Sequence, residues 1–138
     1  MLNVDHRTYP VDDAEQIIEI NATTIDDYLA SNNITHIDFI KMDIQGFEMS
    51  ALKGMEKTLI NNPGVKIITE LWPYGLEKAG SSASEVYDFL HSLGFYLFLF
   101  TKTELQPLTQ QTLKELKNLE DSYYNVVVSK ENFKHPTL

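Results

Sequence analysis

Residues 37–54 have the sequence IDFIKMDIQGFEMSALKG, in which the hydrophobic pattern changes halfway. The first part is almost continuously apolar, which predicts a strand over residues 37–44 that is buried on both faces, as strands of parallel sheets usually are. From Phe47 onward the apolar residues recur at helical spacing, which predicts a helix over residues 47–60. The polar residues between them therefore stand at the carboxyl end of a strand and the start of a helix. Open α/β sheets bind their ligands at such positions.

Strands and helices alternate on both sides of this stretch. Helices are expected to begin at the N-cap residues Thr24, Ser82 and Thr112. The alternation predicts an α/β fold with a mostly parallel sheet, helices on both faces and an antiparallel last strand. The further strands are expected over residues 16–20, 65–71, 95–101 and 123–129.

Length and composition predict one folded domain. The 138 residues are 43% hydrophobic, which is enough for one core. We expect residues 1–14 to be a loose lead-in, residues 15–130 to form the domain and residues 131–138 to be a tail. A net charge of -9 with no basic run argues against binding to nucleic acid. The absence of an apolar span and of a signal peptide predicts a cytoplasmic protein without a membrane partner.

The motif Lys-x-Asp-x-Gln-Gly-x-Glu over residues 41–48, followed by Leu-Lys-Gly, resembles the FkbM family of S-adenosylmethionine-dependent methyltransferases. In that family the fifth position of the motif is usually Glu, where this chain has Gln45. Residues 24–29, 67–71 and 124–128 are similar to neighbouring family segments, so the resemblance covers roughly residues 16–130. It implies a Rossmann-like, class I methyltransferase sheet, S-adenosylmethionine as cofactor, and O-methyl transfer to a small-molecule or sugar hydroxyl.

The family's glycine-rich turn at the cofactor has no counterpart in this sequence. No two of the six glycines are close enough to form one. The chain therefore resembles the carboxyl half of the family domain, a truncated domain without the first strands. In the family's sheet order, residues 37–44 would lie beside the missing first strand and expose an edge. We expect a homo-oligomer, or a partner chain that supplies the amino half, to cover that strand.

Asp43 is the first candidate for a catalytic residue. A carboxylate at the strand end can orient a hydroxyl acceptor, accept its proton and favour a cationic cofactor. Glu70 ends the next strand at the same edge and is the second catalytic candidate. The structural alternatives are that Asp43 caps the following helix and that Glu70 is a solvated strand end.

Other residues at this edge are candidates for binding. The candidates are Asp43, Gln45, Gly46 and Glu48 for the cofactor, and Lys41, Trp72 and Tyr74 for the acceptor. Each class has a structural alternative. Glu48 can complement the helix dipole, Lys41 can form an ion pair inside its apolar strand, and the aromatic rings can be core packing. The four scattered histidines and the absence of cysteine predict no metal site.

Two functions from different classes remain open on this basis. The first is a methyltransferase whose missing half is supplied by a partner or lies in a longer natural chain. The second is a non-catalytic half-domain that associates through its exposed strand edge.

Overall fold

The computed structural model describes residues 21–133, so the strand expected over residues 16–20 lies outside the described part. None of the helices in that part is long and apolar enough to cross a membrane. In chain order the elements are α1 (Ile25–Ser31), β1 (Phe39–Met42), α2 (Glu48–Lys53), α3 (Glu56–Asn61), β2 (Lys66–Leu71), α4 (Pro73–Lys78), α5 (Ala83–Ser92), β3 (Tyr96–Phe100), β4 (Leu105–Pro107), α6 (Gln110–Glu115) and β5 (Tyr124–Ser129).

The five strands form one mixed sheet in the order β1-β2-β5-β3-β4. β1 and β2 pair in parallel, whereas β5 lies between β2 and β3 and pairs antiparallel with both. β4 pairs antiparallel with β3 at the far edge. The antiparallel last strand is therefore confirmed. The prediction of a mostly parallel sheet is wrong, because the insertion of β5 replaces a parallel contact between β2 and β3 by two antiparallel ones.

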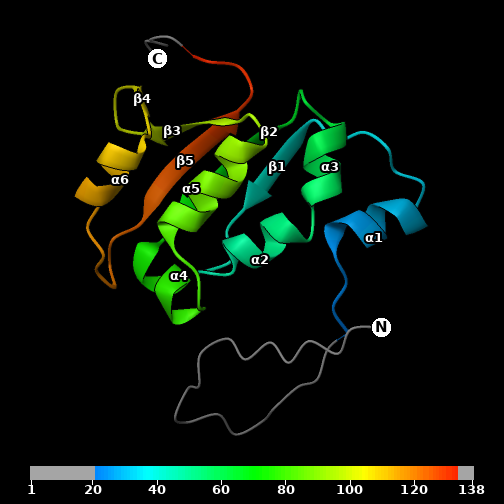
Figure 1. The fold of residues 1–138 in the computed structure, drawn as a ribbon, viewed down its shortest axis with the longest axis horizontal. Coiled ribbons are helices and arrows are strands. Elements are labelled where there is room, and N and C mark those ends of the chain that lie inside the picture. The colour runs from blue at the N-terminus through cyan, green and yellow to red at the C-terminus, as the bar shows by residue number, and fades with distance from the viewer. Residues whose placement is uncertain (1–20, 134–138) are drawn as a thin grey trace, which may run out of the picture.

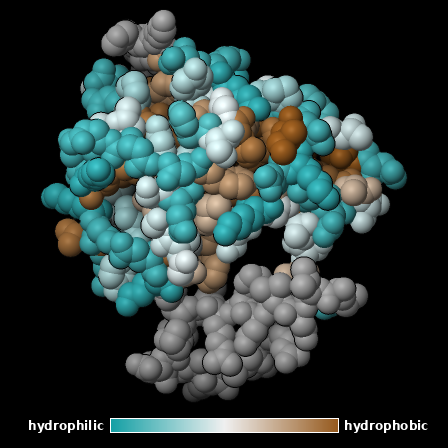
Figure 2. All heavy atoms as spheres, viewed as in Figure 1, coloured by the Kyte–Doolittle hydropathy of each residue, from teal (hydrophilic) through white to brown (hydrophobic). Residues whose placement is uncertain are grey.

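Helices cover one face of this sheet, which we call the inner face. Successive side chains of a strand point to opposite faces. Those on the inner face, among them Ile67, Val126 and Val128, are buried in one core with apolar side chains of the helices. Figure 1 shows α5 crossing in front of the strands on this side, with α2 and α4 near the strand ends. The surface of this helical layer is mostly hydrophilic (Figure 2).

The opposite, outer face carries apolar side chains that no described helix covers. Phe39 is 54% exposed, and Ile68 and Phe100 are also exposed. Phe98 is buried because the Phe133 ring lies against it, with ring centroids 5.3 Å apart. Two predictions are therefore wrong for residues 21–133. The sheet does not have helices on both faces, and the strand within residues 37–44 is not buried on both faces. The register places Phe39 on the uncovered side.

β1 lies at the edge of the sheet. Within residues 21–133 its only strand partner is β2, so its second edge is unpaired in that part of the chain. An unpaired edge presents backbone N–H and C=O groups to any extended segment that approaches it.

The helix expected over residues 47–60 is divided into α2 and α3, with Gly54 and Met55 between them. The side chain of Asp26 explains why a second helix, α3, begins here, because it accepts hydrogen bonds from the backbone N–H groups of Lys57 and Thr58 at 3.1 and 2.9 Å. This carboxylate satisfies amides at the beginning of α3 that have no partner within the helix.

Two short elements, α4 and β4, are missing from the sequence prediction, and α6 begins earlier than expected. α4 has Pro73 in its first turn, a position that suits the fixed φ of proline. The N-cap of α6 is Thr109 rather than Thr112, because the two threonines cap one another reciprocally. The N-caps expected at Thr24 and Ser82 are confirmed by their side-chain hydrogen bonds to backbone N–H groups three residues later.

Candidate functional site

A tight turn after β1 places the polar residues of the motif. Gln45 has φ of 55° and Gly46 has φ of 100°, both in the left-handed region. That region is open to glycine and costly for most side chains. The backbone N–H of Gly46 donates a hydrogen bond to Oε1 of Glu48 at 3.2 Å, which holds the turn against the start of α2.

The turn brings together four polar side chains from the ends of β1 and β2, which we call the strand-end cluster: Lys41, Asp43, Gln45 and Glu70. The amide of Gln45 donates to Oδ1 of Asp43 at 3.2 Å and to Oε2 of Glu70 at 3.4 Å. Nζ of Lys41 lies 3.5 Å from Oδ2 of Asp43. The structure therefore joins both catalytic candidates through the side chain that departs from the family pattern.

The charges of this cluster are not balanced. Two carboxylates share one lysine and one neutral amide, so the cluster carries a net negative charge when both carboxyls are ionised. The side chains of Lys41 and Asp43 are well exposed, so their ion pair contributes little to stability. Lys41 is exposed on the outer face, and its ion pair with Asp43 is the structural pairing that the alternative expects.

Glu48 differs from the other candidates because it is only 1% exposed. Its Oε1 accepts the hydrogen bond from Gly46, and its Oε2 has no hydrogen-bond partner among residues 21–133. Burial raises the pKa of Glu48, and the nearby charge of Asp43 raises it further, against the opposing effect of the backbone N–H groups. Glu48 therefore supports the turn from inside the protein and has almost no surface to offer a ligand.

Trp72 and Tyr74 lie where β2 passes into α4, beside the strand-end cluster in sequence. Trp72 is only 8% exposed, and its Nε1 donates to the carbonyl of Glu120 at 3.1 Å. Its ring stacks on Tyr123 with centroids 5.1 Å apart and packs against Tyr74 at 5.8 Å. The core-packing alternative thus describes most of Trp72, while Tyr74 remains half-exposed.

Tyr123 is a candidate that the sequence prediction missed. It directly precedes β5, and it comes beside Trp72 because Tyr124 pairs with Leu71 in the sheet. No local pattern marks this contact, since Trp72 and Tyr123 are 51 positions apart in the chain. The available signal was the expected antiparallel last strand, which would bring its first residues to the end of β2.

Comparison with known proteins gives one finding. A model of the methyltransferase FkbM domain matches residues 3–97, which is more than half of the chain. No curated protein and no solved structure matches the chain.

Proposed function

Because the chain belongs to the FkbM methyltransferase domain family, we propose that it is part of an S-adenosylmethionine-dependent enzyme that methylates a hydroxyl oxygen. The observation that carries this proposal is the strand-end cluster, in which Gln45 holds Asp43 and Glu70 side by side at the carboxyl ends of β1 and β2. Ligands of open α/β sheets bind at this edge.

The residues of the cluster fit the charged part of the proposed cofactor. S-adenosylmethionine would supply the methyl group as a sulfonium cation, and the negative charge of Asp43 and Glu70 favours a cation beside them. Gly46 has no side chain, which allows close approach to the backbone of the turn. We assign Asp43, Gln45 and Gly46 to cofactor binding. The buried Glu48 instead holds the turn in place through its hydrogen bond with Gly46.

Asp43 and Glu70 also have the chemistry that the acceptor needs. In this proposal Asp43 accepts the proton of the acceptor hydroxyl while the oxygen takes the methyl group, and Glu70 orients the same hydroxyl. Lys41 holds Asp43 by its ion pair, and Tyr74 borders the acceptor. We also propose that the complete domain has the class I, Rossmann-like methyltransferase fold, on which these roles depend.

The proposal includes a polypeptide partner at β1. The unpaired edge of β1 and the exposed Phe39 beside it suit a further strand with apolar side chains. A second copy of this chain or a separate α/β segment can supply that strand.

Calorimetric titration with S-adenosylmethionine tests the role of Asp43. We expect the chain to bind the cofactor and Asp43→Asn to lose most of the affinity, because a neutral amide no longer attracts a sulfonium. The matched control is Asp38→Asn, at the other end of β1, where the carboxylate is exposed and pairs with His36 at 2.9 Å. This control should bind like the wild type.

Two results would contradict the proposal. Equal affinity of wild type and Asp43→Asn excludes Asp43 from the cofactor site. No binding by the wild type at millimolar cofactor excludes the chain by itself as the methyltransferase. Circular dichroism of each variant checks that the fold is retained.

A further inference from the structure

An exposed aromatic ring stands at the carboxyl end of β2, outside the residues that the family model matches. The ring of Tyr123 stacks on Trp72 with an interplanar angle of 27°. Trp72 is 8% exposed, whereas Tyr123 is 43% exposed. Tyr123 is therefore the solvent-facing ring of the pair, and a ring that served only to fill the core would be buried.

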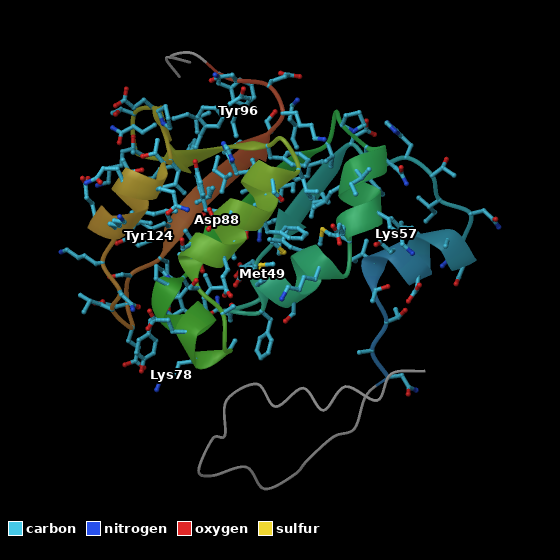
Figure 3. All side chains as sticks on the ribbon, in the orientation of Figure 1. Met49, Lys57, Lys78, Asp88, Tyr96 and Tyr124 are labelled. Carbon is cyan, nitrogen blue, oxygen red and sulfur yellow. The ribbon has the colours of Figure 1, made fainter. Side chains whose placement is uncertain are left out.

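The protein holds this stack in place from several sides. The carbonyl of Glu120 fixes the indole N–H of Trp72. Gly75 packs so closely under the indole that a Cβ there would lie 2.0 Å from its Cε3 atom. Tyr74 packs against the indole, and Nζ of Lys78 lies 5.2 Å from the centroid of the Tyr74 ring. Figure 3 shows Lys78 at α4, on the end of the molecule away from Tyr96. A ring positioned in this way loses little conformational entropy when it binds a ligand.

Polar side chains lie on the same face as the stack. Glu70 pairs with Asn125 across β2 and β5, so their side chains point to the same side of the sheet. Trp72 has extended backbone angles and follows Glu70 by two positions, which keeps it on that side. Asn125 is exposed, and Glu70 is half-buried and bound to Gln45. Glu70 thus belongs to the strand-end cluster and lies on the same face of the sheet as the aromatic stack.

We propose that Tyr123, with Asn125 and Glu70, forms a subsite for a neutral sugar ring, and that this sugar carries the acceptor hydroxyl. The C–H face of a sugar ring stacks on an aromatic ring, and its hydroxyl groups hydrogen-bond to carboxylate and amide oxygens. The negative charge of the cluster and the net charge of -9 disfavour a phosphorylated or nucleotide ligand. The statement that this sugar is the methyl acceptor rests on the proposed function. Binding of the sugar itself does not depend on the cofactor.

The single tryptophan of the chain makes the subsite directly observable. Because Trp72 stacks on Tyr123, its fluorescence should respond to a sugar bound on that ring. We would titrate the chain, without cofactor, with methyl glucoside, methyl galactoside, methyl fucoside and maltose, and use glucose phosphate as the charged comparison. Ligand-observed saturation-transfer NMR gives a second reading that does not depend on the indole.

The expected result is saturable binding of at least one neutral sugar and weaker binding of the phosphate. Tyr123→Ala should weaken that binding about tenfold, Asn125→Ala should weaken it less, and Tyr123→Phe should retain it. The matched control is Tyr96→Ala. Tyr96 is also 43% exposed, but it pairs with Ser129 at the opposite end of β5 from Tyr124 (Figure 3).

The inference is overturned if no neutral sugar binds the wild type saturably, or if Tyr123→Ala binds it with unchanged affinity. The outcome is separate from that of the cofactor titration. Sugar binding without cofactor binding would exclude the chain by itself as the methyltransferase and leave the subsite standing, and cofactor binding without sugar binding would refute the subsite alone.

Discussion

At the scale of single residues, Glu48 has the least expected environment. A glutamate at the first position of a helix is usually exposed and complements the helix dipole. Here the side chain is buried; one oxygen accepts from the N–H of Gly46, and the other has no hydrogen-bond partner in the described part of the chain. Burial raises its pKa above the ordinary value of 4.5, so the folded chain holds this proton to higher pH than the unfolded chain does. Its contribution to stability is therefore present below the unfolded pKa and is lost as the pH rises through the folded pKa.

Glu48→Gln tests this linkage. Glutamine keeps an oxygen for Gly46 and cannot lose a proton, so the variant should gain stability relative to the wild type as the pH rises from about 4.5 toward neutrality. Urea unfolding at several pH values measures the difference in free energy of unfolding. Glu77→Gln, an exposed position of α4, is the control and should show no such trend. A difference between Glu48→Gln and wild type that does not change with pH would contradict the prediction.

At the scale of secondary-structure elements, the beginning of the described chain acts as a cap for a distant helix. Thr24 caps its own helix α1 through the N–H of Asp27. Asp26 instead reaches α3, where its carboxylate accepts from the N–H groups of Lys57 and Thr58 and from the Thr58 hydroxyl at 2.6 Å. The backbone N–H of Asp26 also donates to the carbonyl of Gly54 at 2.9 Å. These bonds join α1 to the break between α2 and α3.

Asp26→Ala should destabilise the protein by about 1–2 kcal/mol, the usual cost of losing a helix cap. The neighbouring carboxylate gives a matched control, because among residues 21–133 the Asp27 side chain accepts no hydrogen bond from α3. Asp27→Ala should therefore cost much less. Thermal or urea unfolding of the two variants measures both effects, and equal destabilisation would show that Asp26 does not cap α3.

At the scale of the whole molecule, the sheet within residues 21–133 is covered on one face, and β1 lies at one of its two edges with one side unpaired. The N–H of Lys66 donates to the carbonyl of Asp38, so the alternate residues Ile40 and Met42 also direct their backbone groups toward β2. The backbone groups of Phe39 and Lys41 then point to the free edge. This pattern provides a test of the partner that we propose at β1.

Hydrogen exchange distinguishes the two edges of this one strand. If a second copy of the chain pairs with β1, the amides of Phe39 and Lys41 should become more protected as the protein concentration rises. The amides of Ile40 and Met42 are internal controls, because β2 already protects them at every concentration. Light scattering should show dimers over the same range. Fast exchange at Phe39 and Lys41 in a monomer at all concentrations would exclude a second copy, and added protection by another polypeptide would identify a separate partner.

Local sequence patterns predicted much of the fold and of the candidate site. The apolar run before Asp43 and the helical spacing after Phe47 are short-range signals, so strand, turn and helix were placed correctly to within a few residues. The carboxyl ends of parallel strands meet at one edge, and this rule predicted that Asp43 and Glu70 would be neighbours. Antiparallel pairing of the last strand was also predicted.

The sequence by itself determined most of the strands and helices, though not the short elements α4 and β4, and it determined which side chains end the parallel strands. These properties depend on residues close together in the chain. Only the tertiary structure decided that β5 lies between β2 and β3, that Tyr123 stacks on Trp72, and that Asp26 caps α3. It also decided which face of the sheet the helices cover. These features depend on register and packing between segments far apart in sequence, which hydrophobic periodicity does not encode.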